Sequence, residues 1–69
     1  MKYSSRNVYE GKVKVIKKGP VNSEVALELP GGMEVVATLT TQSVERLGLK
    51  EGGKATAMIK ATSVILATE

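Results

Sequence analysis

The sequence predicts a mostly β protein: a small barrel of five short strands with one short helix between the third and fourth strands. Apolar and polar residues alternate over most of the chain, which is typical of strands with one buried face. Turn signals rich in glycine separate the alternating runs. One stretch, residues 41–49, changes to the three-residue spacing of a helix.

Three strands are expected before the helix, separated by two turns. They are Val8 to Lys18, Glu24 to Leu29 and Met33 to Thr40. In the first strand Val13 and Val15 alternate with lysines, so both are expected on the same face. Gly19-Pro20-Val21-Asn22 predicts the first turn because proline fixes φ and asparagine tolerates left-handed conformations. Pro30-Gly31-Gly32 predicts the turn of a hairpin.

The helix is expected over Thr41–Leu49 and is about two turns long. Thr40 or Thr41 offers a hydroxyl to cap its first amides. Gly48 suits the left-handed residue that ends many helices. Val44 and Leu47, three residues apart, would share one face of this helix.

Two further strands are expected after the helix, at Lys54 to Lys60 and Val64 to Ala67. The turn signal Glu51-Gly52-Gly53 precedes them, and Ala61-Thr62-Ser63 interrupts the pattern between them. Five short strands with a helix between the third and fourth indicate a barrel of the OB type.

The chain is short for an independently stable domain. A domain of 69 residues buries only about 60% of the surface that its unfolded chain exposes. The sequence contains no cysteine and no histidine, so disulfides and zinc–thiolate sites are excluded as support. Several expected strands also carry an apolar residue on the outward face, namely Ile16, Val36, Met58 and Ile65. Association between copies of the chain is the expected source of the missing stability.

Composition argues against an enzyme. Histidine and cysteine, the commonest general base and the best thiol nucleophile, are absent, and the seven carboxylates are scattered along the chain. The net charge of +3 is compatible with an anionic partner, although the basic residues do not cluster. We find no signal peptide and no stretch of about 18 apolar residues that would span a membrane. A cytoplasmic protein is therefore expected.

Two segments are polar where a strand would not require it. Ser4-Ser5-Arg6-Asn7 precedes the first strand, and Lys60-Ala61-Thr62-Ser63 separates the last two. Both offer hydroxyls, a cation and backbone N–H groups, and neither contains a carboxylate. A tetrahedral oxyanion only accepts hydrogen bonds, so its site must consist of donors. From composition alone a solvated tail and an ordinary turn are the simpler interpretations of the two segments, and spacing cannot show that they meet.

A third polar segment, Thr40-Thr41-Gln42-Ser43, lies at the expected start of the helix. Helix N-termini attract anions, but threonine and serine also cap helices routinely, and capping is the simpler interpretation. The pairs Gly31-Gly32 and Gly52-Gly53 lack the spacing of phosphate-binding loops and are expected to serve turns.

Along nearly its whole length the chain resembles the molbindin (Mop) domain family, whose members also occur as domains of molybdate-responsive regulators and transporter ATPases. The resemblance depends on the order and spacing of short motifs: Ser4-Ser5-Arg6-Asn7 before Gly11-Lys12-Val13, then Gly19-Pro20-Val21-Asn22-Ser23-Glu24-Val25, Leu39-Thr40-Thr41-Gln42-Ser43-Val44, Leu47-Gly48-Leu49-Lys50-Glu51-Gly52 and Ile59-Lys60-Ala61-Thr62-Ser63-Val64-Ile65-Leu66-Ala67. The first motif of the family usually reads Ser-Ala-Arg-Asn. Serine at its second position is a small departure that should keep the backbone donors.

The resemblance implies that residues 1–69 form a single molybdate-binding domain. It implies an oxyanion site in which the first motif of one chain meets the last motif of another. In that site Ser4 and Thr62 would donate hydroxyls, Arg6 and Lys60 would supply charge, and Ser5 and Ala61 would supply backbone N–H groups. No residue would coordinate the metal directly. A second type of site near a threefold axis would involve four residues: Val21, Asn22, Thr41 and Ser43.

The resemblance also implies the function and the assembly. The expected protein binds and stores molybdate or tungstate in the cytoplasm without catalysis. It would assemble as a hexamer, a trimer of dimers, with strands exchanged between partners. No nucleic-acid partner and no membrane are expected.

Two alternatives remain open. An OB-type nucleic-acid module would fit the fold and the pI near 9.4, but it would stack bases on aromatic residues, and this chain has only Tyr3 and Tyr9. The acidic residues also alternate along the strands that would form its groove. The chain could instead be an isolated regulatory domain with a protein partner. It contains neither a helix-turn-helix nor a nucleotide-binding loop, so it is not itself the regulator or the ATPase.

Overall fold

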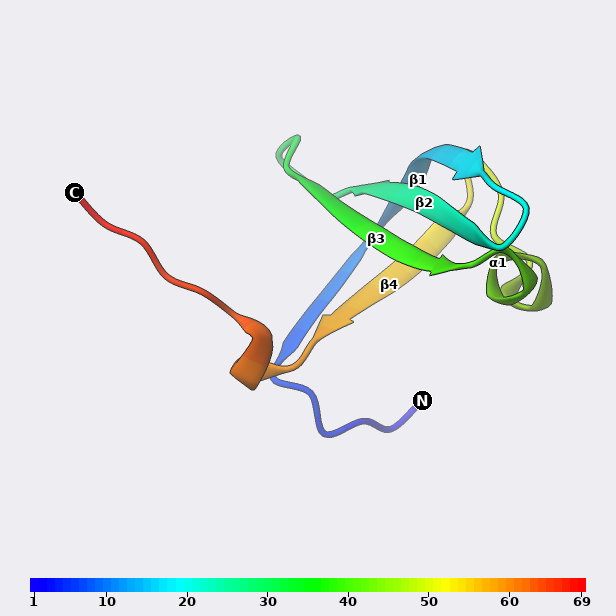
Figure 1. The fold of residues 1–69 in the computed structure, drawn as a ribbon. Coiled ribbons are helices and arrows are strands. Elements are labelled where there is room, and N and C mark those ends of the chain that lie inside the picture. The colour runs from blue at the N-terminus through cyan, green and yellow to red at the C-terminus, as the bar shows by residue number, and fades with distance from the viewer.

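A computed structural model describes all of residues 1–69, in which a twisted antiparallel sheet curls into a half-barrel (Figure 1). The elements are β1 (Asn7–Lys18), β2 (Asn22–Glu28), β3 (Glu34–Thr40), α1 (Thr41–Leu47), β4 (Lys54–Ile59) and the 3₁₀ turn η1 (Ala61–Ser63). The strand order is β3-β2-β1-β4, and every neighbouring pair is antiparallel. The mostly β class and the single helix between the third and fourth strands are confirmed.

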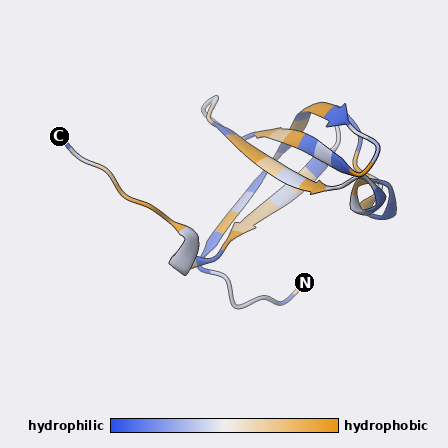
Figure 2. Ribbon diagram, in the orientation of Figure 1, coloured by the Kyte–Doolittle hydropathy of each residue, from blue (hydrophilic) through white to orange (hydrophobic).

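The predicted fifth strand, Val64 to Ala67, is absent from the single chain. Val64 has extended backbone angles, φ −88° and ψ 129°, but the segment pairs with no other strand. After η1 the chain runs away from the sheet, and its apolar residues stand clear of the core (Figure 2). A strand needs a neighbour for its N–H and C=O groups. Because this segment has none within its own chain, the expected closed five-stranded barrel is wrong for one chain, and the sheet stays open between β3 and β4.

A β-bulge reverses the predicted facing of two residues in β1. The pairing of β1 with β2 shifts between Val13 and Val15, so Lys14 is an extra residue on the β1 side. Alternation restarts after the bulge, and Ile16, expected to face outward, packs against the core instead. Val15, expected to share the buried face of Val13, is 36% exposed.

The β1–β4 ladder ends just before the bulge. Beyond Lys12 the pairing with β4 ends, and the loop before β4 takes over. The amide of Val13 donates to the carbonyl of Gly53 at 2.8 Å, and the amide of Gly52 donates to the carbonyl of Val13 at 2.8 Å. The Glu51 carboxylate accepts from the amide of Ile16 at 3.1 Å. These contacts cover the part of the β1 edge that β4 does not reach.

Helix α1 begins and ends at the residues named as its capping signals, and it is two residues shorter than the expected range Thr41–Leu49. The Thr40 hydroxyl accepts a hydrogen bond from the amide of Ser43 at 3.0 Å, which makes Thr40 the N-cap. Gly48 adopts the left-handed conformation, with φ 67°, and its amide donates back to Glu45 and Val44. The helix therefore ends at Leu47 rather than Leu49.

The core is very small. Its five buried apolar residues come from β1, from β2 and the position just after it, and from α1: Val13, Val25, Leu27, Leu29 and Val44. Val44 is 1% exposed, so it is the residue of the helix that packs into the core. No helix has the length and apolar character needed to cross a bilayer.

Replacement of Gly11 by alanine tests how closely β1 and β2 pack. A Cβ at this position would lie 2.5 Å from the carbonyl oxygen of Glu28 and 3.0 Å from side-chain carbons of Leu27 and Leu29. We expect Gly11→Ala to lower the free energy of unfolding by about 1–3 kcal/mol, measured by urea denaturation at fixed protein concentration. Exposed Glu10 provides the control, since Glu10→Ala should change it by no more than about 0.5 kcal/mol. Equal stability of the two variants would contradict the close approach of the strands.

Candidate functional site

The pairing of β1 with β4 brings the two donor-rich segments together. This ladder runs from Lys12 opposite Lys54 to Asn7 opposite Ile59. Ser4 to Arg6 therefore precede β1 at the same end of the sheet where Lys60 to Thr62 follow β4. All six predicted site residues line one open depression of about 210 Å³, which contains no other residue in its lining.

The lining consists of hydrogen-bond donors and uncompensated positive charge. Arg6 and Lys60 are both exposed, and neither forms an ion pair. The hydroxyls of Ser4 and Thr62 make no hydrogen bond within the chain, so both are free to donate. No carboxylate lines the depression. Such a lining is suited to an anion that accepts hydrogen bonds from several directions.

Turn η1 fixes the backbone of the second segment. The amides of Ser63 and Val64 donate to the carbonyls of Lys60 and Ala61, at 2.8 and 3.3 Å. The amides of Ala61 and Thr62 come before the first hydrogen bond of this turn, which makes no use of them. The backbone donor expected of Ala61 is thus left free by the turn.

One chain alone contributes both segments to this depression. The resemblance implied that they would come from two chains. The end of the β1–β4 ladder explains why they already meet within one chain. The further contribution of a second chain stays a prediction.

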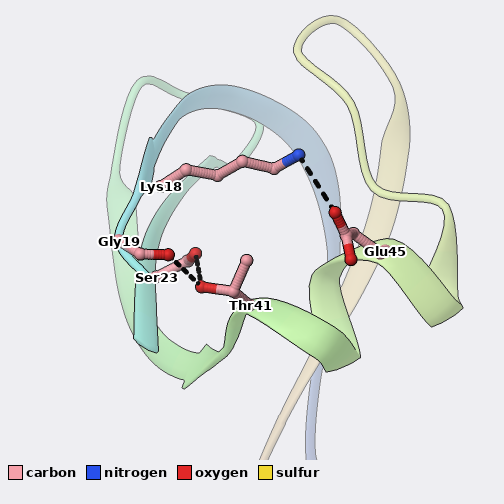
Figure 3. Close-up of polar contacts among 5 residues, drawn as sticks. All are labelled: Lys18, Gly19, Ser23, Thr41 and Glu45. Atoms are coloured by element: carbon pink, nitrogen blue, oxygen red, sulfur yellow. Dashed lines mark hydrogen bonds and ion pairs between the residues drawn. The ribbon is translucent and has the colours of Figure 1, made fainter. Parts of the chain in front are cut away.

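The four residues of the predicted second site have structural partners. The Thr41 hydroxyl donates to the carbonyl of Gly19 at 2.7 Å (Figure 3). The hydroxyl of Ser23 lies 2.7 Å from the Thr41 hydroxyl. Since Thr41 has a single hydroxyl hydrogen, Ser23 is the donor of the second bond. The amide of Thr41 donates to the carbonyl of Val21. The amide of Ser43 donates to the hydroxyl of Thr40, the N-cap. Asn22 lies opposite Thr40 in the β2–β3 pairing. The Thr40 cap confirms the capping interpretation, and the Thr41 contacts fasten the β1–β2 turn to α1. An anion site there stays a prediction.

The largest depression on the surface lies elsewhere and has a different character. It has a volume of about 610 Å³ and lies at the opposite end of the β1–β4 ladder. Glu10 and Glu28 line it together with Lys12 and Lys54, so donors and carboxylates are mixed. A dianion would be repelled by the two carboxylates. We therefore place the candidate oxyanion site in the smaller depression.

Comparison with known proteins identifies the family of the chain. The family model of the TOBE domain matches residues 3–66. Molybdenum-pterin-binding protein 1 of Clostridium pasteurianum is 46% identical over 66 residues, which cover 96% of this chain and 97% of that protein. The chain belongs to the TOBE domain family, among the molbindins (Mop proteins).

Two solved structures extend the similarity of this molbindin to its fold. A molybdate-binding protein from Sporomusa ovata superimposes with a TM-score of 0.91 at 41% identity, covering 99% of this chain and 100% of that one. The cytoplasmic molybdate-binding protein ModG, solved with molybdate bound, gives a TM-score of 0.90 at 48% identity and covers 94% of this chain and 46% of that one. The family suggested by the sequence motifs is confirmed.

Sequence reasoning missed two side-chain contacts in this molbindin. Ser5 was expected to contribute its backbone N–H group, and no side-chain contact was expected of Ser5 or Asn7 with the rest of the chain. In the structure both side chains donate to the carbonyl of Ile59, at 3.3 Å from Ser5 and 3.1 Å from Asn7. No sequence signal identifies this acceptor, because it is a backbone atom 54 residues away from Ser5.

The Ser23–Thr41 contact generates a stability prediction. Thr41→Val removes the hydroxyl and leaves the Ser23 hydroxyl, in a residue only 2% exposed, without its partner. Leaving a buried polar group unpaired costs about 1–3 kcal/mol, so we expect a clearly lower melting temperature by calorimetry. Thr38→Val makes the same chemical change on an exposed strand position and should melt like the unmodified protein. Identical melting of the two variants would show that the contact contributes nothing.

Proposed function

We propose that this chain binds and stores molybdate, and that it carries out no catalysis. The observation that supports this most directly is the depression lined only by Ser4, Ser5, Arg6, Lys60, Ala61 and Thr62. Every one of these residues offers a donor or a positive charge. The names of the relatives and of the superimposed structures, which describe molybdenum-pterin-binding and molybdate-binding proteins, support the same ligand.

The chemistry of the ligand matches the lining. Molybdate is a tetrahedral dianion whose four oxygens accept hydrogen bonds and donate none. We propose that Arg6 and Lys60 balance its charge, that Ser4 and Thr62 donate hydroxyls, and that Ser5 and Ala61 donate backbone N–H groups. Charged donors form shorter and stronger bonds to such an ion than neutral donors. Tungstate has the same shape and charge, and we propose that the site accepts it as well.

Nothing in the site favours a nucleic acid. No aromatic side chain lines the depression, whereas single-stranded nucleic acids are held largely by stacking on aromatic rings. We propose a cytoplasmic location, as the description of ModG states for that protein.

We further propose that the protein works as a homo-oligomer, a hexamer built as a trimer of dimers, with sites at the subunit interfaces. The single chain exposes 5694 Å² at a mass of 7.3 kDa. A compact monomer of that mass exposes about 4,200 Å². The excess of about 1,500 Å² exceeds the roughly 800 Å² that each partner buries in a standard interface. The excess exposed surface is therefore enough for more than one interface between subunits.

The C-terminal segment is the best candidate for the exchanged strand. Ile65 and Leu66 are 92% and 89% exposed. An apolar groove of about 150 Å³ opens on the inner side of the half-barrel, between residues of β2, β3 and β4, and Leu47 and Leu49 also line it. We propose that residues Val64 to Ala67 of a second copy lie along this opening as the fifth strand. The barrel would then be completed between chains and not within one.

Removal of either cation tests the oxyanion site. A hydrogen bond to a charged group contributes about 1.5–3 kcal/mol, so we expect Arg6→Ala and Lys60→Ala each to weaken molybdate binding roughly 10- to 100-fold in calorimetric titrations. Lys17→Ala, an exposed position opposite Glu24 of β2, removes the same charge elsewhere and should bind like the unmodified protein. The mass of the assembly should be unchanged in all three. Full affinity in both site variants would refute the assignment.

A charge in the C-terminal segment tests the proposed assembly. Ile65→Asp places a carboxylate on the apolar strand that would enter a partner's groove, so native mass spectrometry should show smaller species in place of the hexamer. Thr68→Asp adds the same charge beyond the segment and should leave the hexamer intact. Circular dichroism reports whether each chain is folded. An intact hexamer in Ile65→Asp would rule out this segment as the exchanged strand.

A further inference from the structure

The carbonyl of Ile59 lies where the two donor-rich segments leave the sheet. It accepts a hydrogen bond from the side-chain amide (Nδ2) of Asn7 at 3.1 Å and from the Ser5 hydroxyl at 3.3 Å. The Ser5 hydroxyl also lies 3.2 Å from the carbonyl of Asn7, so its single hydrogen is shared between two acceptors. We propose that Ser5 and Asn7 are positioning residues, which hold the first segment against the second before an oxyanion binds. This inference rests on the proposed function of the site.

The position of these bonds explains why they are needed. Asn7 opposite Ile59 is the last pair of the β1–β4 ladder, so no strand pairing holds Ser4, Ser5 and Arg6. The Ser5 side chain supplies the one hydrogen bond between this segment and β4. The Asn7 side chain adds a bond to the same carbonyl at the last pair of the ladder, where the segment begins. Ser5 is half-buried, whereas Ser4 and Arg6 on either side are exposed. One anchored residue thus lies between two free donors.

Anchoring lowers the cost of binding. A free N-terminal segment loses backbone freedom when it closes on a ligand, and this loss subtracts from affinity. A segment that is already fixed loses less. The anchor therefore improves affinity without contacting the ligand.

The same two hydrogen bonds also occupy the carbonyl oxygen of Ile59, which would otherwise disfavour an anion. The carbonyl of Ile59 immediately precedes Lys60, and a carbonyl oxygen that faced the site would repel an anion. Two donors directed at this oxygen satisfy it within the protein. Ser5 keeps its backbone N–H free for the ligand while its side chain holds the segment.

Substitutions that keep the backbone donors separate positioning from direct contact. Ser5→Ala and Asn7→Ala remove the two bonds singly, and Ser5→Thr keeps the hydroxyl as a conservative variant. We expect molybdate affinity to fall roughly twofold to fivefold in Ser5→Ala and about five- to tenfold in Asn7→Ala, with Ser5→Thr within about twofold of the unmodified protein. Thr38→Ala, which removes an exposed hydroxyl elsewhere on the sheet, should bind normally.

Backbone ¹⁵N relaxation without ligand provides the readout that a purely structural role would not produce. In Asn7→Ala we expect lower order parameters confined to residues 4–6 and 60–62, with the order parameters of the rest of the sheet and the melting temperature unchanged. Unchanged affinity and order parameters in the Ser5→Ala/Asn7→Ala double variant, beside an unmodified protein that binds molybdate, would overturn the positioning role alone. Absence of any heat of binding in the unmodified protein would overturn the proposed function, and the positioning role with it.

Discussion

The antiparallel pairing of β1 with β4 is the constraint on which the rest of the molecule depends. It joins the start of the chain to its end, so that Ser5 lies within hydrogen-bond distance of Ile59, 54 residues later. Its register matters as much as its existence, because a slip of one residue would turn every side chain of a strand to the other face. Opposite Ile59, Asn7 ends the ladder, and the segments beyond this pair can point their donors into one depression. At the other end the ladder stops at Lys12, just before the bulge at Lys14 in the pairing of β1 with β2.

The small core of the chain accounts both for the open site and for the need for partner chains. With five buried apolar residues, the chain has too small a core to enclose a ligand completely. It offers instead a depression on its surface, open to solvent on one side and lined by donors. A second chain that covered this depression would exclude water and strengthen each hydrogen bond to the anion. Association would then supply stability and ligand enclosure together, which is why we place the exchanged strand and the oxyanion in one proposal.

Local features of this fold could be predicted from the sequence, and features that depend on distant partners could not. Thr40 and Gly48 carry recognisable capping chemistry, and the structure uses both as expected. Val15 and Ile16 were assigned to the wrong faces because a bulge changes the alternation, although two adjacent apolar residues hinted at an irregularity. The C-terminal segment was expected to be a strand from its residues, yet strand formation requires a neighbour that one chain does not provide. The six site residues were identified from composition and resemblance, whereas the acceptor of Ser5 and Asn7 is a backbone carbonyl that only the fold reveals.

The most direct test is a crystal structure of the protein grown with tungstate, with the tungsten atoms located by their anomalous scattering. We predict an anomalous peak in the depression between Ser4 to Arg6 and Lys60 to Thr62, with the Arg6 guanidinium and the Lys60 ammonium within hydrogen-bond distance of the oxyanion. An anomalous map with no peak there, or with peaks only beside Lys12 and Lys54 at the other end of the ladder, would contradict the central claim that the β1–β4 pairing builds the oxyanion site.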